Sequence, residues 1–388
     1  RHTRYGTVTG VQTCALPIWS GEGIPVVLTF DPMSETWTVA PPMRHGRWYP
    51  SIVQLADGTS LVIGGHAEGG RNIANPDLEL IRPDGSAPSL VGTIKMGAGE
   101  DVYPAAYQLP DGRVFSFAGK QTNWIDPTTW RISNGPVVLA REYLYPNGTL
   151  LPFTPGGHAL LLMTGGRPSP STLADATVVS NRIDLSVPSP VFRAMTPLPQ
   201  PRTNSNTVLL PDGSMALVGG NITGAFGTPT LQTLLYDVAA DTWKPAASQT
   251  MRRAYHSTAL LLPDGRVLSG GDNGVGGGNS TLEFYSPPYL FRGPRPTVTR
   301  APSSAARGAT ITAATDVHVG RAVLIAPGAV THASNLHQRE IQLATTSGST
   351  SGLTAVVPAD GTTPPGIYML FVLSDAGVPA VATWITIT

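Results

Sequence analysis

The chain has 388 residues with 25 Lys and Arg against 25 Asp and Glu, so its formal net charge is zero and only 13% of its residues are charged. This balance excludes a nucleic-acid-binding protein or a polybasic membrane patch, because both need a cationic surface. Gly and Pro are frequent, at 43 and 37 residues, while 41% of the chain is hydrophobic, which predicts many short strands joined by tight turns. No apolar run is long enough for a transmembrane helix, and no signal-peptide pattern opens the sequence.

The first residues have an unusual origin. Residues 8–18 read VTGVQTCALPI, which back-translates to a common sequencing-library adapter, and residues 1–4 match the preceding adapter arm. We therefore interpret residues 1–18 as an adapter-derived artefact and exclude them from fold reasoning. The segment contains Cys14, the only cysteine of the chain, so we assign Cys14 no function.

A string of the form apolar-(Pro/Ala)-Asp-Gly-x-x-apolar-x-x-Gly-Gly recurs through the next part of the chain. Copies occupy residues 55–65, 210–220 and 262–271, with weaker ones at 109–119 and 153–166. Their spacing, about 45 to 56 residues, is a propeller-blade period. Each Asp-Gly supplies the positive-φ residue of a hairpin turn, and the apolar run after it predicts a buried strand that ends at a crowded glycine pair.

A second repeated element is an aromatic-Asp pair followed by Trp. It occurs from Phe30-Asp31 to Trp37 and from Tyr236-Asp237 to Trp243, and a shortened version spans residues 126–130. A glycine pair followed by an aromatic residue and Trp is the kelch pattern. We therefore predict that residues 19–292 form an incomplete kelch-type β-propeller.

The repeat stops near Ser286, and a Pro-rich bridge at 292–296 leads into a new rhythm. Residues 293–388 are predicted to form an immunoglobulin-like antiparallel β-sandwich of about 95 residues. Its expected strands lie at 322–325, 340–343 and 368–373. The predicted fold class is therefore all-β, a propeller followed by a sandwich.

Three short motifs carry a family resemblance. Arg47-Trp48-Tyr49-Pro50 and Arg253-Ala254-Tyr255-His256-Ser257 each precede a blade strand, and Thr331-His332-Ala333-Ser334-Asn335 lies in the second domain. Their order and context resemble galactose oxidase and glyoxal oxidase, the copper radical oxidases. The resemblance extends from Trp19 to Thr388 and implies a propeller that has seven blades when complete.

The resemblance implies a copper cofactor together with a protein-derived tyrosyl radical. Tyr49 would then be the redox-active tyrosine and a metal ligand, and His256 and His332 equatorial ligands. Tyr255 would be the axial ligand and the base that takes the substrate hydroxyl proton. Chemistry gives an independent reason, since Cu(II) favours tetragonal sites of nitrogen and oxygen donors, which two imidazoles and two phenols supply.

Other polar residues are weaker candidates. His337 is the rival of His332, but its offset of five residues faces it the other way on a strand, and the family motif aligns on Thr-His-x-x-Asn. His45 and His158 are predicted to be solvated or packed. Candidates for substrate contact, by their expected place in inter-blade loops, are Arg202, Arg141 and Gln121.

Two departures from the family pattern affect the expected activity. His66-Ala67 follows the glycine pair where galactose oxidase carries a tryptophan stacked over the radical site, so we expect aldehydes or simple alcohols to be preferred over galactose. The family's thioether cysteine would lie upstream of Trp19. We therefore expect the chain as written to be inactive, and the full-length natural protein to be the oxidase.

Two functions from different classes remain. The first is a secreted copper radical oxidase that oxidises a small aldehyde, alcohol or carbohydrate with O2 and releases hydrogen peroxide. The second is a noncatalytic kelch propeller and sandwich that bind carbohydrate or protein, which the fold alone would permit. Four aligned copper donors favour the first. A kelch-type sialidase is a weaker third possibility, because the sequence motifs of that enzyme class are missing. Low cysteine and lysine contents, with the family's habit, predict export.

Overall fold

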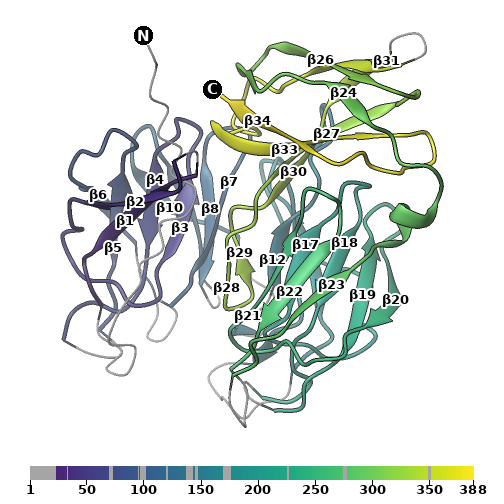
Figure 1. Ribbon diagram of the computed structural model, residues 1–388. Coiled ribbons are helices and arrows are strands. Elements are labelled where there is room, and N and C mark those ends of the chain that lie inside the picture. Colours follow the sequence, from purple (N-terminus) through teal and green to yellow (C-terminus); the bar gives the residue numbers. More distant parts are fainter. Residues whose placement is uncertain are drawn as a thin grey trace. The chain divides into compact units, whose positions relative to one another are not determined.

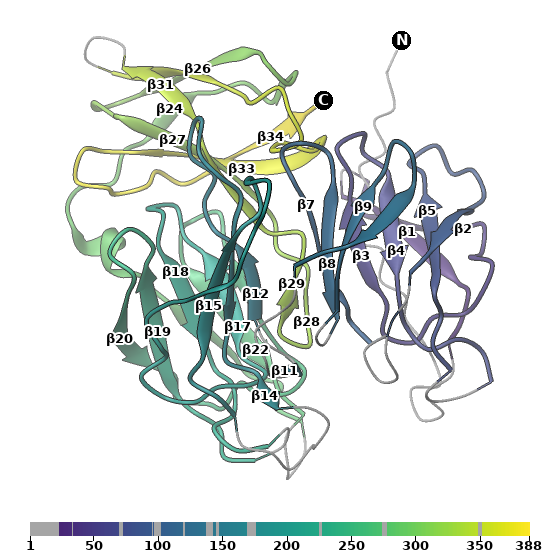
Figure 2. The same cartoon turned by 180° about the vertical axis from the view of Figure 1, so that it is seen from behind.

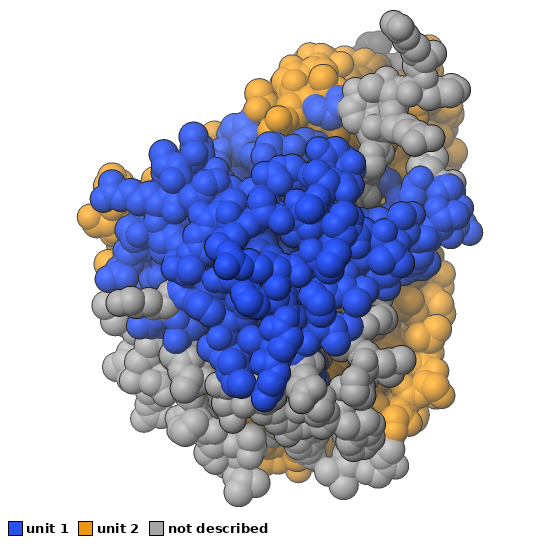
Figure 3. Space-filling view, turned by 90° about the vertical axis from the view of Figure 1, so that its left-hand side faces the viewer, with its two compact units in different colours: residues 1–138, 360–367, 388 blue, residues 139–359, 368–387 orange. Residues whose placement is uncertain are grey.

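The computed structural model describes most of the chain from Gly23 onward. The described residues are 23–32, 34–69, 73–94, 96, 102–118, 121–136, 143–144, 147–168, 176–224, 227–273, 278–347 and 351–388. They form two compact units, one within residues 1–138, 360–367 and 388, the other within 139–359 and 368–387 (Figure 3). The interpretation of residues 1–18 and Cys14 falls outside the described residues.

Two four-stranded antiparallel sheets and a two-stranded one make up the first unit. Each four-stranded sheet is a meander with its strands in chain order, as a propeller blade requires. The strands are β3 (Ser51–Gln54), β4 (Ser60–Ile63), β5 (Asp77–Ile81) and β6 (Ser89–Thr93); β7 (Ala105–Gln108), β8 (Val114–Ala118), β9 (Gln121–Asp126) and β10 (Arg131–Asn134); and β1 (Val27–Asp31) with β2 (Thr36–Ala40). Apolar side chains of the two meanders, among them Leu61, Leu78 and Val114, pack together in one core.

The second unit contains three further blade-like sheets (Figures 1 and 2). Two are four-stranded and one is three-stranded, again antiparallel and in chain order, and a short pair lies beside them. The strands are β12 (Asn147–Leu150), β13 (Leu160–Thr164), β15 (Ser180–Asp184) and β16 (Arg193–Ala194); β17 (Asn206–Leu209), β18 (Met215–Val218), β19 (Gln232–Asp237) and β20 (Thr242–Ser248); β21 (Ser257–Leu261), β22 (Val267–Gly271) and β23 (Leu282–Tyr285); and β11 (Tyr143–Leu144) with β14 (Arg167–Pro168).

A sandwich domain follows the blades after a short 3-10 helix, η1 (Pro288–Phe291). One of its sheets has the order β24-β26-β32-β31 and the other β25-β34-β33-β27-β30, and a hairpin, β28-β29, projects from it. The strands are β24 (Val298–Arg300), β25 (Ser304–Ala305), β26 (Thr310–Thr315), β27 (Arg321–Ala326), β28 (Val330–Thr331), β29 (Ser334–Asn335), β30 (Arg339–Gln342), β31 (Ala344–Ser347), β32 (Leu353–Val356), β33 (Gly366–Leu373) and β34 (Thr383–Ile387). The predicted all-β fold class, propeller blades followed by a sandwich, is confirmed.

The Asp-Gly strings form the hairpin turns that the sequence predicted. Gly58 and its counterparts in the other copies have φ of 81 to 89°, a region that side chains disfavour. Each aspartate accepts a hydrogen bond from the backbone N–H two residues further on, as Asp57 does from Thr59 at 2.9 Å. This Asx turn gives the repeated Asp its physical reason.

The glycine pairs are required by close packing. A Cβ on Gly219 would lie 1.9 Å from the carbonyl oxygen of Arg253, and one on Gly165 would lie 2.2 Å from that of Arg202. Gly219 and Gly165 therefore lie against the loop that leads into the following blade, and no larger residue fits there.

The aromatic-Trp element also has a structural cause. Phe30 pairs with Trp37 across β1 and β2, and Tyr236 pairs with Trp243 across β19 and β20. The ring centroids are 4.9 and 4.6 Å apart. The motif is thus a cross-strand aromatic pair at the outer hairpin of a blade. Within the described ranges, no helix is long and apolar enough to cross a membrane.

Candidate metal centre

Three of the four predicted metal ligands lie together in the second unit. The ring centroids of Tyr255 and His256 are 3.9 Å apart, those of His256 and His332 4.3 Å, and those of Tyr255 and His332 5.1 Å. The His332 ring stands nearly perpendicular to both others, at 84° to His256 and 79° to Tyr255. Two imidazoles and a phenol thus converge, although Tyr255 and His256 are separated from His332 by more than seventy positions in the sequence.

The local backbone explains how two adjacent residues serve one site. Tyr255 and His256 lie just before β21, and His256 has φ of 63°. Compared with the loop before β3, the loop before β21 has one additional residue between its arginine and the Leu-x-Asp-Gly turn. On a regular strand the two side chains would face opposite ways, so the extra residue and the left-handed bend keep them on one side.

His332 sits at the tip of the β28-β29 hairpin. Thr331 pairs with Ser334, and the two residues between them, His332 and Ala333, have φ of 49 and 68°. Two successive positive φ angles define a type I′ turn, which usually takes Asn-Gly. His332 and Ala333 occupy it at a conformational cost of roughly 1–2 kcal/mol each, and such strain is typical of functional sites.

Contacts with the propeller strands fix this hairpin. It packs against β12, β17 and β21, and Figures 1 and 2 show it beside them. The side-chain amide of Gln338 adds two hydrogen bonds to β17, accepting from the N–H of Leu209 at 3.1 Å and donating to the carbonyl of Thr207 at 3.0 Å. A sandwich segment therefore delivers His332 to the inner strands of the second unit.

Hydrogen bonds and burial prepare both imidazoles for a metal. Nδ1 of His332 lies 2.7 Å from Oγ1 of Thr331, and Nδ1 of His256 lies 3.4 Å from Nδ2 of Asn273. The Thr331 hydroxyl can accept from Nδ1–H of His332, which makes Nε2 the atom of that ring that would coordinate. The amide nitrogen of Asn273 can only donate, so its contact makes Nδ1 of His256 an acceptor and does not assign the coordinating atom of that ring. Burial, and secondarily the charge of His256, lowers the pKa of His332 to about 3. Burial also lowers the pKa of His256, against the opposing effect of Asp272. Both rings are therefore neutral at pH 7, the form in which an imidazole binds a metal.

The donor set suits copper better than other metals. The described part of the chain has no group of three or more His, Cys, Asp or Glu that could hold a metal. A site built from imidazoles and phenols is outside that class. Cu(II) accepts such nitrogen and oxygen donors in tetragonal geometry, whereas Ca2+ and Mg2+ favour carboxylate-rich sites. The residues present fit copper.

Tyr49, the fourth predicted ligand, lies in the first unit. It precedes β3, with φ of 64°. Its ring stacks on that of Trp48 at 3.7 Å and 13°, and on that of Tyr103 at 4.7 Å and 28°. The N–H of Tyr103 also donates to the carbonyl of Tyr49 at 2.9 Å. Tyr49 is thus held between two aromatic rings.

This stack adds residues that the sequence reasoning missed. The sequence has His66-Ala67 after the glycines, where galactose oxidase carries its stacking tryptophan. In the structure Trp48 supplies an indole to Tyr49, and the ring of His66 stacks on that of Trp48 with centroids 5.2 Å apart. Tyr103 was missed too. The available signal was the repeated Tyr-Pro pair before an inner strand, at Tyr49 and again at Tyr103.

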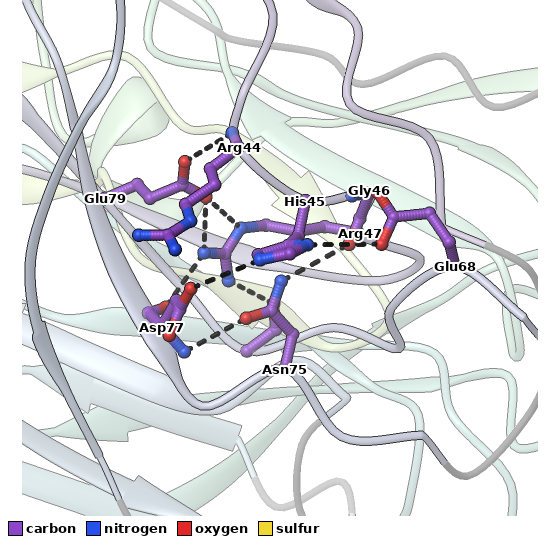
Figure 4. Close-up of polar contacts among 9 residues, drawn as sticks. Arg44, His45, Gly46, Arg47, Glu68, Asn75, Asp77 and Glu79 are labelled. Atoms are coloured by element: carbon purple, nitrogen blue, oxygen red, sulfur yellow. Dashed lines mark hydrogen bonds and ion pairs between the residues drawn. The ribbon is translucent and has the colours of Figure 1, made fainter.

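Arg47 anchors the loop of Tyr49 (Figure 4). Its guanidinium is fully buried. It donates to Glu79 at 2.7 and 3.2 Å and to the carbonyls of Gly64 and Asp77 at 2.8 Å each. His45 lies beside this network, half-exposed and 3.6 Å from Glu68, as a surface histidine rather than a partner of Tyr49.

The remaining candidates fall outside the cluster of donors. His158 is exposed and contacts Asp184 at 2.5 Å, and His337 is half-buried beyond the end of β29. Arg202 is fully buried and donates to the carbonyls of Gly219 and Gln232, so it anchors its own blade. Gln121 begins β9 rather than lying in a loop, and Arg141 lies outside the described residues.

Comparison with known proteins gives the family. The model for the N-terminal part of glyoxal oxidase matches residues 20–287, and that for the galactose oxidase-like early set domain matches residues 295–387. The chain belongs to the galactose oxidase and glyoxal oxidase family. The resemblance stated from the three motifs is thereby confirmed.

Relatives within this family are distant. A galactose oxidase of Gibberella zeae is 31% identical over 391 residues, which cover 92% of this chain and 57% of the relative. An aldehyde oxidase of Arabidopsis thaliana is 27% identical, covering 88% of this chain and 63% of the relative. The chain thus spans less than two thirds of the length of these relatives.

A solved structure of the family is also similar. It is a fungal alcohol oxidase with catalytic diversity among the AA5 family, in complex with copper. It has a TM-score of 0.84 and 27% sequence identity, and the match covers 94% of this chain and 81% of that one. The family is therefore one of copper oxidoreductases.

Proposed function

We propose that this chain carries the copper site of a radical oxidase that converts an aldehyde or primary alcohol with O2 into the oxidised product and hydrogen peroxide. The observation that supports it is the convergence of Tyr255, His256 and His332 from two domains, with both imidazoles neutral. A binding module would have no need of this arrangement. Tyr49 enters the proposal by the sequence resemblance.

Each residue has a distinct task in the proposal. Tyr49, Tyr255, His256 and His332 would hold copper, which when bound would take up one of the two electrons that the substrate loses. The phenol of Tyr49 would supply the place for the second. The phenol oxygen of Tyr255 would take the substrate hydroxyl proton, as a general base must do at hydrogen-bond distance. Export from the cell belongs to the same proposal.

Copper binding by this chain tests the proposal directly. Cu(II) should bind the purified chain in a tetragonal environment, seen by electron paramagnetic resonance. His256→Ala and His332→Ala should each weaken binding strongly, whereas His158→Ala, at an exposed histidine of the same unit, should not. Equal affinity of the wild type and the two site variants would refute the assignment.

Turnover is a separate question. Because the thioether cysteine is expected upstream of this sequence, the copper-loaded chain should show no persistent tyrosyl radical absorption. A longer natural form with that cysteine should release peroxide from aldehydes or simple alcohols. Peroxide release measured over a panel of aldehydes, primary alcohols and galactose decides the substrate class.

A further inference from the structure

Two glutamates hold corresponding loops in two different blades. Oε1 of Glu79 accepts a hydrogen bond from the N–H of Arg44 at 2.7 Å, and its Oε2 lies 2.7 Å from the guanidinium of Arg47. Oε1 of Glu283 accepts from the N–H of Thr250 at 2.7 Å, and its Oε2 lies 3.4 Å from the guanidinium of Arg253. In both blades the N–H belongs to the residue three positions before the arginine.

The two glutamates are equivalent by strand register. Glu79 on β5 pairs with Val62, and Glu283 on β23 pairs with Ser269. Val62 and Ser269 each stand five residues after the aspartate of their Asp-Gly turn, Asp57 and Asp264. We call this arrangement, a glutamate that binds both the buried arginine and the N–H three residues before it, the glutamate clamp.

The clamp fixes the chain immediately before the predicted ligands. On its other side each arginine donates to a glycine carbonyl, Arg47 to Gly64 at 2.8 Å and Arg253 to Gly271 at 3.3 Å. Arg47 and Arg253 are both fully buried. Glu79 is buried as well, whereas the side chain of Glu283 is 21% exposed. Charge-assisted contacts of this kind are strong and directional, most of all in the buried Arg47–Glu79 pair, so both ends of each loop are tied to the blade.

A third blade serves as a natural comparison. Arg202 occupies the same place and donates to the carbonyl of Gly219 at 3.0 Å. The strand position that holds the glutamate in the clamped blades holds Leu234 here, which pairs with Leu217. The residue three positions before the arginine is Pro199, which has no N–H to donate. The loop after Arg202 carries Asn204 at the position where the loop after Arg47 carries Tyr49.

The blade that Tyr103 enters also lacks the clamp glutamate. Tyr103 lies two residues before β7, as Tyr49 does before β3, and also has positive φ, 49°. Asn123 on β9 pairs with Ser116 and occupies the glutamate register there. Among these four blades, the clamp is therefore found where the loop carries a predicted copper ligand.

We propose that Glu79 and Glu283 are positioning residues, which hold Tyr49 and the Tyr255-His256 pair in ligand geometry through Arg47 and Arg253. That these residues are copper ligands rests on the function proposed above. Tyr49 and His256 share their left-handed backbone conformation with Tyr103 and Asn204, so the clamp, and not the backbone angle, distinguishes the two loops that carry predicted ligands.

A metal-free measurement tests the positioning by itself. The protein is labelled with 3-fluorotyrosine, and Tyr49→Phe and Tyr255→Phe identify the two 19F resonances. Glu79→Gln should shift or broaden the Tyr49 resonance and leave that of Tyr255 unchanged, and Glu283→Gln should do the reverse. Arg202→Lys, which disturbs a buried arginine without a clamp, should leave both unchanged.

Copper affinity gives the second readout. Removal of a group that orients a ligand typically costs about 10- to 100-fold in metal affinity. Glu283→Gln should therefore raise the Kd for Cu(II) by that factor relative to Arg202→Lys. Failure of the wild type to bind copper would refute the proposed function, while the 19F spectra would still judge the clamp.

A double variant covers the case in which the single variants do not fold. Arg47→Met with Glu79→Leu replaces the buried ion pair by apolar side chains of similar size, a change that is often neutral for stability. The urea midpoint should stay near that of the wild type while the Tyr49 resonance moves. Unchanged tyrosine resonances in the folded clamp variants, or equal changes in Arg202→Lys, would overturn the proposal.

Discussion

Glu340 makes the stability of the second unit depend on pH. It lies on β30, where its backbone carbonyl accepts a hydrogen bond from Phe153 and its side chain is completely buried. Nε2 of Gln342 lies 3.4 Å from Oε1, and Oε2 has no hydrogen-bond partner among the described residues. Burial, reinforced by the charge of Asp212, raises the pKa of Glu340 to about 8, in spite of Gln342 and Arg321.

The size of the effect follows from linkage. In the unfolded chain the carboxyl titrates near pH 4.5, and in the folded protein near 8. The folded state therefore holds its proton more tightly, and the stabilisation it gives is complete below pH 4.5 and lost as pH rises through 8. At about 1.4 kcal/mol per pH unit, the loss amounts to about 5 kcal/mol.

Glu340→Gln should remove this dependence. The amide is neutral at every pH and keeps an oxygen to accept from Gln342. The variant should match the wild type near pH 4.5 and be more stable by up to about 5 kcal/mol at pH 9. Urea unfolding followed by circular dichroism from pH 4.5 to 9 measures it, with Glu35→Gln, at an exposed glutamate, as the control. Parallel stability curves for the wild type and Glu340→Gln would refute the reasoning.

Three further predictions concern the site and its supports. In the longer natural form that we propose to be the oxidase, Tyr255→Phe should slow peroxide release by roughly 10²- to 10⁴-fold, as loss of a general base does, while Tyr49→Phe should abolish it. Full activity of Tyr49→Phe would eliminate the radical mechanism. Gln338→Ala removes both hydrogen bonds from the His332 segment to β17. It should lower the free energy of unfolding by about 1–3 kcal/mol and weaken Cu(II) binding. The control is Gln54→Ala, which removes a side-chain hydrogen bond in the first unit and should leave Cu(II) affinity unchanged. Gly219→Ala should destabilise the protein far more than Gly156→Ala. Both glycines have φ near 67°, but a Cβ at Gly219 would lie 1.9 Å from the carbonyl oxygen of Arg253, whereas one at Gly156 meets nothing within 4 Å. Equal thermal midpoints of the two variants would contradict the packing argument.

Much of the fold was readable from the sequence because its signals are local. The Asp-Gly turns need positive φ and an Asx bond two residues on, so both residues recur at four of the inner hairpins, while the turn between β12 and β13 uses Gly156-Gly157. The predicted sandwich strands at 322–325, 340–343 and 368–373 fall within β27, β30 and β33, apart from the last residue of the second. The boundary at residue 293 and the roles of Tyr49, Tyr255, His256 and His332 stay predictions.

The support of the site was not readable in the same way, because it depends on register between strands. Glu79 and Glu283 are unremarkable in sequence, and only the pairing of β5 with β4 and of β23 with β22 shows that they are equivalent. Trp48 was visible as a neighbour of Tyr49, but adjacent residues rarely stack. They do so here because Tyr49 leaves the strand conformation, with φ of 64°.

Backbone strain connects the fold to the chemistry. Apart from Asp272, which follows Gly271, the left-handed non-glycine residues of the described chain occur at two kinds of place: turn positions such as Glu35 and Asp241 in outer hairpins, and the inner-strand entrances and hairpin tip that include Tyr49, His256 and His332. The second kind costs about 1–2 kcal/mol per residue. Before β21 it lies in a turn, in which the N–H of Ser257 donates to the carbonyl of Ala254 at 3.0 Å. Buried arginines and glycine pairs offset that cost, since they hold the loops from the blade side. The predicted donors are thus held in place by the folded blades before any metal arrives, so copper binding need not order them, and a variant that loosens a blade should weaken copper affinity even where it touches no donor.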